Sequence, residues 1–353
     1  MPRYRQRTHD IRSFILQNVD DHAKDITAFT AESFGISRPA VLRHVRNLID
    51  DGLLLVHGKT RDRHYALKTL AELELQLEIT PDLAEDTIWR QRIRPLLEGV
   101  PANVLTICEY GFTEMLSNVV DHSEGDTAIV TMTRSAARMR IAVLDDGIGI
   151  FRKIQTELGL DDQRHAILEL SKGKLTTDPQ QHTGEGIFFT SRAFDHFQIL
   201  SGDLFFAHDT LGDDWLLETE DTGPGTYVIL KIDPRSDRRL QEVFDRYAAE
   251  ADDFGFTRTR VPVTLVRYGQ ENLVSRSQAK RLLARFERFR EVILDFKGVD
   301  TIGQAFADEI FRVYPQKHPE VHLVPLNVKE QVANMIGRVA DTMDSSVLPG
   351  PAK

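Results

Sequence analysis

Residues 141–150 read IAVLDDGIGI, an apolar run that ends abruptly in two acids and two glycines. The apolar residues predict a buried β-strand, and the acids and glycines mark where it ends. A carboxylate at the end of such a strand, Asp145, is expected to face a dry cleft and to accept a hydrogen bond from a specific donor. Gly147 and Gly149 leave room for a flat or phosphorylated group near the backbone. An ordinary strand-to-loop turn is the alternative.

A helix is predicted just upstream, over residues 101–120, with its apolar residues on one stripe. Glu114, Asn118 and His122 are spaced by four and therefore lie along one helical face beside that stripe. A carboxylate, an amide and an imidazole one turn apart can serve as a base, a metal ligand and a phosphate contact. Mg²⁺ suits such a set because it prefers oxygen ligands and takes most of its shell from water and phosphate.

Two more signals follow along the chain. Residues 182–187 read HTGEGI, and Gly225-Thr226 stands directly before a predicted strand at residues 227–232. In this order, the four signals resemble the GHKL superfamily, whose nucleotide pocket is shared by gyrase, histidine kinases and anti-sigma-factor kinases. The resemblance covers roughly residues 71–235, and the Glu-Asn-His spacing looks most like the anti-sigma-factor kinase branch. It implies a Bergerat α/β sandwich that binds ATP and Mg²⁺.

The resemblance also implies roles for single residues. Asn118 would hold Mg²⁺, Glu114 would act as a base or position a water, and Asp145 would accept the adenine amino group. The polar segment 151–183 has the place and composition of an ATP lid, where a lysine would reach a phosphate or remain a solvated charge. The further residues expected to contact ATP are His122, Gly147, Gly149, Lys174, Gly184, Gly186 and Thr226.

Composition indicates a globular protein without membrane segments. The chain has 353 residues, enough for two or three domains, with 41% hydrophobic and 28% charged residues. No apolar run approaches the length of a membrane span, and the charged N-terminus carries no signal-peptide pattern. The single cysteine, Cys108, excludes an intrachain disulfide. We therefore expect a cytoplasmic protein that does not contact the membrane.

The N-terminal segment is the part whose charge favours a polyanion. Residues 1–70 carry twelve Lys and Arg against eight Asp and Glu, net +4, in a chain of net charge −10. Helices are predicted at residues 8–19 and 27–34, and a third begins after Ser37, its N-cap. A hairpin around the basic loop 58–63 follows. Through GISRPAVLRHVRNLIDDGLL this segment resembles a winged helix-turn-helix.

That resemblance implies contacts with double-stranded DNA. Helix residues would meet base edges and the cations of the wing would meet phosphates. The residues expected at bases are Ser37, Arg38, Arg43 and Asn47, and those expected at phosphates are Lys59, Arg61 and Arg63. A homodimer fits this class, because such regulators often read two half-sites. The alternative is a winged helix with solvated charges that serves dimerisation, since net +4 is modest for a DNA binder.

Strands and helices alternate beyond Asp233, which predicts a small α/β domain over residues 255–340. The stretch VILDFKGVDTIGQAFADEIFRVYP resembles STAS-like domains. In anti-sigma-factor antagonists a phosphorylatable serine follows the equivalent strand. Here that place falls near Gln304 and Ala305, and only Thr301 is a nearby hydroxyl. Strands are expected at residues 261–267, 291–296 and 321–325, helices at 275–289, 303–314 and 328–340, and a disordered tail at 341–353.

The sequence therefore predicts an α+β multidomain protein: a winged helix-turn-helix over residues 1–70, a GHKL domain over 71–235 and a STAS-like domain over 255–340. The expected function is an ATP-responsive transcriptional regulator, in which Mg²⁺-ATP closes the lid and alters DNA or partner binding. The alternative is a serine/threonine protein kinase that acts on a separate regulator protein. ATP hydrolysis and protein phosphorylation both remain open at this point.

Overall fold

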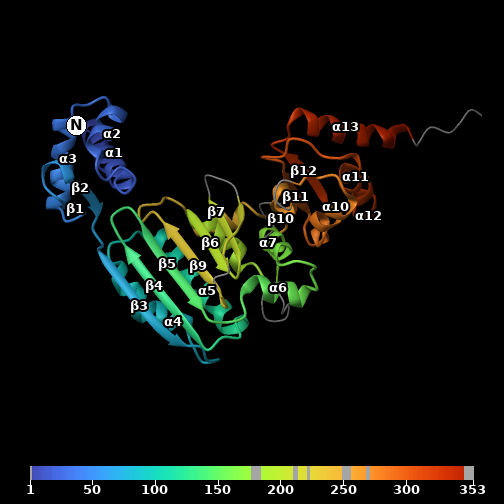
Figure 1. Ribbon diagram of the computed structural model, residues 1–353, viewed down its shortest axis with the longest axis horizontal. Coiled ribbons are helices and arrows are strands. Elements are labelled where there is room, and N and C mark those ends of the chain that lie inside the picture. Colours follow the sequence, from blue (N-terminus) through green and yellow to red (C-terminus); the bar gives the residue numbers. More distant parts are fainter. Residues whose placement is uncertain are drawn as a thin grey trace, which may run out of the picture.

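The computed structural model describes residues 2–175, 184–209, 214–220, 223–248, 256–267 and 271–345. We call residues 2–70 the N-terminal unit, 71–248 the central unit and 256–345 the C-terminal unit. Within the described ranges each unit contains one β-sheet, so the protein is a mixed α+β molecule with several sheets. The N-terminal and C-terminal units lie at opposite ends of the central sheet (Figure 1).

The N-terminal unit follows the predicted order of helices and hairpin. Its buried side chains include Val41, Val45 and Leu48, which come from one face of the third helix. Ser37 occupies the N-cap position of that helix, and the two strands pair in antiparallel register. The elements are α1 (Pro2–Asn18), α2 (Ile26–Phe34), α3 (Arg38–Asp50), β1 (Leu54–His57) and β2 (His64–Leu67).

The central unit is built on an antiparallel sheet. Over the described residues the sheet has seven strands in the order β3-β4-β5-β9-β6-β7-β8. Strand β3 alternates leucine with glutamate or glutamine, and it pairs with β4 along its whole length. The strands are β3 (Ala71–Glu78), β4 (Thr127–Arg134), β5 (Met139–Asp145), β6 (His196–Ser201), β7 (Leu204–Asp209), β8 (Trp215–Glu218) and β9 (Tyr227–Ile232).

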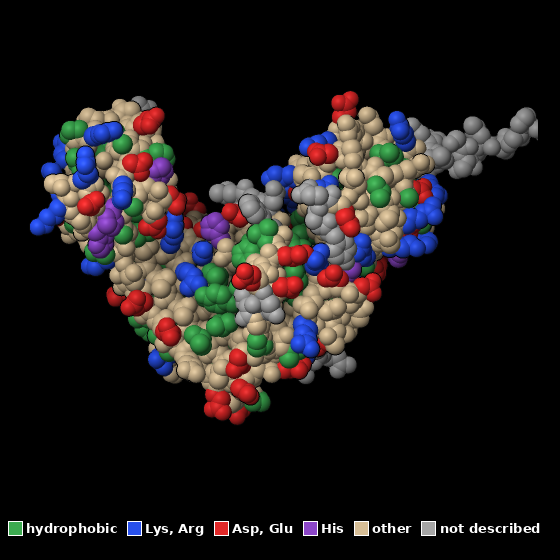
Figure 2. Space-filling view, in the orientation of Figure 1, with side chains coloured by type: hydrophobic (Ala, Val, Ile, Leu, Met, Phe, Trp, Pro, Cys, Tyr) green, Lys and Arg blue, Asp and Glu red, His purple; other side chains and the backbone are tan. Residues whose placement is uncertain are grey.

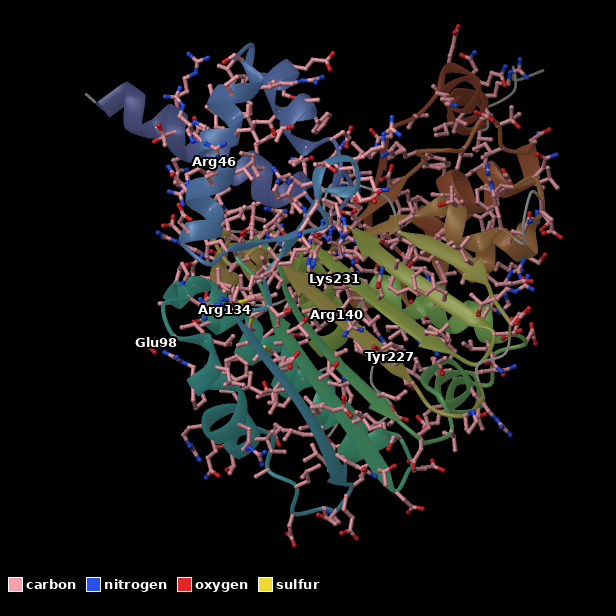
Figure 3. All side chains as sticks on the ribbon, turned by 60° about the vertical axis from the view of Figure 1, so that its left-hand side comes forward. Arg46, Glu98, Arg134, Arg140, Tyr227 and Lys231 are labelled. Atoms are coloured by element: carbon pink, nitrogen blue, oxygen red, sulfur yellow. The ribbon has the colours of Figure 1, made fainter. Side chains whose placement is uncertain are left out.

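One face of this sheet is covered by helices, which lie behind it in Figure 1. The long helix α5 (Ala102–His122) buries the predicted stripe that includes Cys108 and Phe112. Arg134 at the end of β4 donates to the carbonyl oxygen of Glu98 at 2.8 Å, which fastens the segment before α5 to the sheet (Figure 3). The other helices of this layer are α4 (Glu85–Ile88), η2 (Trp89–Ile93), η3 (Arg94–Leu97), α8 (Gly186–Ala193) and α9 (Leu240–Asp245).

The opposite sheet face combines apolar and cationic side chains. Hydrophobic side chains gather over the middle of the sheet (Figure 2), and Leu144 on β5 is 37% exposed. Arg140 on β5 and Lys231 on β9 stand opposite each other in the strand register, and Arg140 donates to the hydroxyl of Tyr227 (Figure 3). This face is therefore distinct from the helix-covered face, where the core of the unit lies.

The predicted lid contains two helices, α6 (Ile150–Leu158) and α7 (Gln163–Lys172). The sequence predicted a polar lid whose lysines reach a phosphate or remain solvated, but residues along α7, including Glu169 and Lys172, are buried. The reason is that α7 packs against β10 and η4 of the C-terminal unit. Polar composition alone therefore did not indicate exposure. Residues 176–183 of the predicted lid lie outside the described residues.

The C-terminal unit has a parallel sheet in the order β10-β11-β12. The predicted first strand starts earlier than expected, and residues 263–266 form a 3-10 helix instead. The last helix continues to Ser345, so residues 341–345 do not belong to a disordered tail, and residues 346–353 lie outside the described part. The elements are β10 (Arg258–Pro262), η4 (Val263–Val266), α10 (Arg276–Leu283), η5 (Phe286–Arg288), β11 (Glu291–Asp295), α11 (Gln304–Asp308), η6 (Glu309–Val313), α12 (Tyr314–Lys317), β12 (His322–Leu326) and α13 (Glu330–Ser345).

The units are joined in different ways. The buried apolar residues of the central and C-terminal units form one continuous cluster. The N-terminal unit has its own cluster, which also includes Ala137 from the turn between β4 and β5. Polar contacts support this junction, with Arg138 donating to Asp20 at 3.0 Å and Gln17 to Asp233 at 3.1 Å. None of the described helices combines the length and apolarity needed to cross a membrane.

Candidate functional site

A cavity of about 300 Å³ opens in the central unit between α5, the end of β5 and the start of α8. Apolar side chains such as Met115, Ile154 and Val228 form part of its wall. Polar groups converge on it from elements far apart in the sequence. The predicted site residues that line it are Glu114, Asn118, His122, Asp145, Gly149, Gly184, Gly186 and Thr226.

Asp145 is the last residue of β5 and lines this cavity. The residue is 5% exposed, and its carboxylate accepts the backbone N–H of Gly147 at 2.9 Å. Burial raises the pKa of Asp145, while the hydrogen bond from Gly147 acts in the opposite direction. An ionised carboxylate can accept several hydrogen bonds, so Asp145 retains capacity for a donor on a ligand.

Two predicted glycines have different roles. A Cβ at Gly147 would overlap the backbone of Ser123, and Gly147 does not line the cavity. In this structure close chain packing requires glycine at position 147, and the N–H of Gly147 orients Asp145. Gly149 does line the cavity and has φ +87°, a conformation that favours glycine, at the start of α6. Thr226 supports this start, because its hydroxyl accepts the N–H of Ile150 at 2.9 Å.

The three polar residues of α5 all reach the cavity, as the spacing predicted. The Nδ2 atom of Asn118 is buried and has no hydrogen-bond partner in the part of the chain that the structure describes. Buried polar atoms normally have a partner, so a bound ligand or water is expected there. Glu114 lies against the first residue of α8, where a Cβ on Gly186 would overlap its carboxylate. Negative charge is favourable at a helix N-terminus.

A cation reaches the cavity from α6 and not from the position the sequence favoured. Lys153 lines the cavity and forms ion pairs with Glu157 at 2.9 Å and with Glu124. The hydrogen bond that Lys153 donates to Glu124, followed by the one it donates to Glu157, raises the pKa of Lys153. In the sequence, its place four residues before Glu157 on the first lid helix is a local signal of this ion pair.

Lys174, the predicted phosphate contact, points elsewhere in this structure. Its ammonium donates to the carbonyl oxygen of Arg288 at 3.0 Å and lies 5.1 Å from the ring centre of Phe289. The C-terminal unit therefore holds this side chain, and Lys174 is not among the described residues that line the cavity. Lys172 is directed to the same unit. The choice among lid lysines depended on tertiary packing that the sequence pattern did not contain.

Two side chains of the cavity could contribute to a Mg²⁺ site. Among the described residues no group of three His, Cys, Asp or Glu could hold a metal ion by itself. Asn118 and Glu114 offer one oxygen-bearing side chain each, one turn apart. Mg²⁺ accepts such a site because water and substrate phosphates supply its remaining ligands. The unpartnered Nδ2 of Asn118 is a hydrogen-bond donor, so an acceptor such as a phosphate oxygen or a water would satisfy it.

The predicted DNA contacts form a second group on the N-terminal unit. Every one of them is exposed, on the outer side of α3 or in the loop between β1 and β2. Lys and Arg side chains project from this unit in Figure 2. None of its predicted cations forms an ion pair with a carboxylate among the described residues, whereas Arg12 pairs with Asp51. The predicted cations are Arg38, Arg43, Lys59, Arg61 and Arg63.

Comparison with known families identifies part of the chain. Residues 278–333 match the family model described as STAS-like domain of unknown function (DUF4325). The C-terminal unit thus contains a STAS-like domain, as the sequence predicted. None of the curated proteins compared with the chain matches it. In this domain Gln304 and Ala305 begin α11, and Thr301 is an exposed hydroxyl before it.

Proposed function

We propose that the protein is a transcriptional regulator whose state is set by Mg²⁺-ATP bound in the central unit. The observation that carries this proposal is the convergence of Glu114, Asn118 and Asp145 on one cavity. In this function the Asp145 carboxylate accepts the adenine amino group and Asn118 holds Mg²⁺. Glu114 then acts as a base or positions the attacking water.

The fold of the central unit supports the GHKL assignment within this proposal. Its antiparallel sheet is covered on one face by α5, and the candidate ligands come from α5, from the end of β5 and from the start of α8. That combination is what a Bergerat sandwich requires. The cavity is also largely apolar between its polar groups, as expected for a site that takes a flat base.

The N-terminal unit supports the DNA-binding part of the proposal. A winged helix-turn-helix places its last helix in the major groove and a hairpin loop on the backbone. Here α3 exposes Arg43 and Asn47 while it buries Val41 and Val45, and the loop after β1 is basic. The predicted DNA-binding cations have no carboxylate partners among the described residues, so binding to phosphates would not break an ion pair. This charge distribution favours DNA binding by the N-terminal unit.

The lid supplies a physical connection between ATP and the STAS-like domain. Leu170 and Leu175 line the cavity. Between them, Lys172 is buried against the C-terminal unit and donates to the carbonyl oxygen of Ala284 at 2.9 Å. Movement of this segment over a nucleotide must therefore alter the contact with the STAS-like domain. ATP shifts the equilibrium between two arrangements only if it binds them with different affinity.

Two substitutions on α5 separate nucleotide binding from turnover. We expect Asn118→Ala to lose Mg²⁺-dependent ATP binding and Glu114→Gln to retain binding while turnover falls by about 100-fold or more, since one residue holds metal and the other handles a proton. Incubation with γ-labelled ATP measures turnover, and calorimetry measures binding.

Free labelled phosphate supports the ATP-responsive regulator, whereas label transferred to a STAS-like or other regulator protein supports the kinase alternative. Parental turnover in Glu114→Gln contradicts the role given to Glu114.

The DNA-binding proposal predicts different effects at two arginines. Arg43→Ala should reduce the preference for a selected operator over random duplex by about tenfold, because a base contact is worth roughly 1–3 kcal/mol. Arg61→Ala should weaken both equally and flatten the salt dependence, because wing cations displace counterions without reading bases. Titration of labelled duplexes at several salt concentrations measures both effects.

Arg239→Ala is the matched control, because this exposed arginine lies in the central unit before α9. Its DNA affinity should equal that of the parent. Failure to select any operator from random sequence argues against specific DNA binding. Equal operator affinity with and without a non-hydrolysable ATP analogue leaves a DNA-binding protein but contradicts the ATP switch.

A further inference from the structure

A second and larger cavity lies between the central and C-terminal units. Its volume is about 830 Å³, and none of the described residues that line it also lines the candidate nucleotide cavity. One wall consists of the ends of β7 and β8 and helix α9, and the other consists of the loops that follow β10 and β11. We call this space the interunit cleft. Its size is in the range of pockets that hold small molecules.

The position of the C-terminal wall is typical of ligand sites. Strands β10 and β11 run parallel and end at Pro262 and Asp295, so their carboxyl ends meet at one edge of the sheet. Both of these residues line the interunit cleft, together with Thr264 and Gly298 just beyond them. In open sheets of parallel strands, ligands bind in the crevice outside the carboxyl ends. The cleft therefore lies at the carboxyl edge of the parallel sheet.

The charge of the cleft favours an anion. Among the described residues that line it there are seven Lys and Arg and four Asp and Glu. Most of these carboxylates already have a cationic partner within the cleft, in the pairs Arg260–Asp295, Arg192–Asp214 and Arg164–Glu218. The positive excess is thus not neutralised by the lining itself.

Two of the cleft arginines are available for a ligand. Arg246 lies at the end of α9, and its guanidinium makes no hydrogen bond or ion pair with any described residue. Arg267, after η4, donates from Nη1 to the carbonyl oxygen of Gly298 at 3.2 Å, but its Nε is buried and has no partner among the described residues. One arginine comes from the central unit and the other from the C-terminal unit, so they belong to opposite walls.

We propose that the interunit cleft binds a small anion that carries phosphate groups, with Arg246 and Arg267 as its contacts from the two walls. Guanidinium groups bind phosphate oxygens in a forked geometry. A phosphate has three such oxygens and can bridge two arginines, whereas a carboxylate has only two. The floor of the cleft is recessed, since the side chain of Asp214 is 3% exposed, which favours a small ligand over an extended polymer. The ligand joins the two units, and the proposal does not depend on ATP binding in the other cavity.

Inorganic pyrophosphate is the probe for this site. Calorimetry of the full chain without Mg²⁺ should detect pyrophosphate binding. Arg246→Ala and Arg267→Ala should each weaken it by about tenfold or more, as expected when a charged hydrogen-bond donor is lost. Arg246→Lys and Arg267→Lys keep the charge but lose the fork, and should fall between the parent and the alanine variants. Circular dichroism will show whether each alanine variant folds. If one does not, the lysine variant at the same position tests the proposal in its place.

Two controls assign the binding to the cleft. Arg239→Ala removes an arginine that does not line the cleft, and Asn118→Ala alters the nucleotide cavity. Both should bind pyrophosphate like the parent. The proposal is overturned if the parent does not bind pyrophosphate, or if Asn118→Ala abolishes binding while the arginine variants do not. Citrate that binds equally well and depends on the same arginines would show that the site does not select phosphate.

Discussion

Replacing Asp145 with asparagine is expected to weaken ATP binding by one to two orders of magnitude while the protein remains folded. The carboxylate is buried and already holds the N–H of Gly147, and asparagine can keep that contact through its carbonyl oxygen. Toward the adenine amino group, however, the amide presents a donor to a donor. A buried mismatch of this kind costs roughly 1–3 kcal/mol or more. Calorimetric titration with Mg²⁺-ATP measures the loss.

The same substitution should increase stability at neutral pH. Burial raises the pKa of Asp145 above its unfolded value, so the folded state favours the protonated carboxyl. Its stabilising contribution is fully present below the unfolded pKa and is lost as the pH rises through the folded pKa. Asparagine is neutral at every pH and escapes this loss. The free energy of unfolding in urea should therefore favour Asp145→Asn increasingly as the pH rises through this window.

The neighbouring acid provides a matched control. Asp146 accepts the N–H groups of Asp126 and Thr127 at 2.9 and 3.0 Å, and it does not line the nucleotide cavity. Asp146→Asn should keep the ATP affinity of the parent. If Asp145→Asn binds ATP with parental affinity, or if both variants lose affinity to the same extent, Asp145 does not contact the adenine.

The largest effect on stability is expected from Lys172→Met. Lys172 is 1% exposed, and its ammonium donates to Glu169 at 2.7 Å and to the carbonyl oxygens of Arg281 and Ala284 at 3.2 and 2.9 Å. Methionine fills similar space but leaves these acceptors unsatisfied. Breaking a buried pair from one side costs about 3–5 kcal/mol. We expect a loss of unfolding free energy at the lower end of this range, because Glu169 keeps an ion pair with Arg285 at 2.8 Å.

Urea unfolding measures this loss, and Lys174→Met is its control. Lys174 belongs to the same segment, but its bond to the carbonyl oxygen of Arg288 is exposed, so its loss should cost about 1 kcal/mol or less. Lys172→Met should also reduce the stabilisation that ATP gives, because Leu170 and Leu175 on either side line the cavity. Equal stability of the two variants would show that the lid is not fastened to the STAS-like domain through Lys172.

Local sequence patterns were enough to predict those site residues whose positions follow from a single helix or strand. The spacing of Glu114, Asn118 and His122 follows from helical geometry, and Asp145 follows from the end of an apolar strand. The packing roles of other residues could not be obtained in this way. Lys174, for example, is bound to the carbonyl oxygen of Arg288 in the C-terminal unit, 114 residues further along the chain, and does not line the cavity.

The same limit explains the lid and the interunit cleft. The buried polar residues of α7 look solvated in the sequence, because their partners come from the C-terminal unit. Arg246 and Arg267 lie in unremarkable surroundings in the sequence and become neighbours of one cleft only in the folded chain. Element boundaries shifted for a related reason. The apolar run 263–266 favours a strand, but in the structure it forms a 3-10 helix that packs against α7 and α10.

Strand β5 has a mechanical consequence for communication across the molecule. Its last residue, Asp145, lies in the nucleotide cavity, and the turn that precedes its first residue places Ala137 in the core of the N-terminal unit. The seven residues of the strand span about 20 Å. Hydrogen bonds to β4 on one side and β9 on the other hold the strand in register. Strand β5 therefore connects the candidate nucleotide cavity directly to the core against which α3, the helix that carries Arg43, packs.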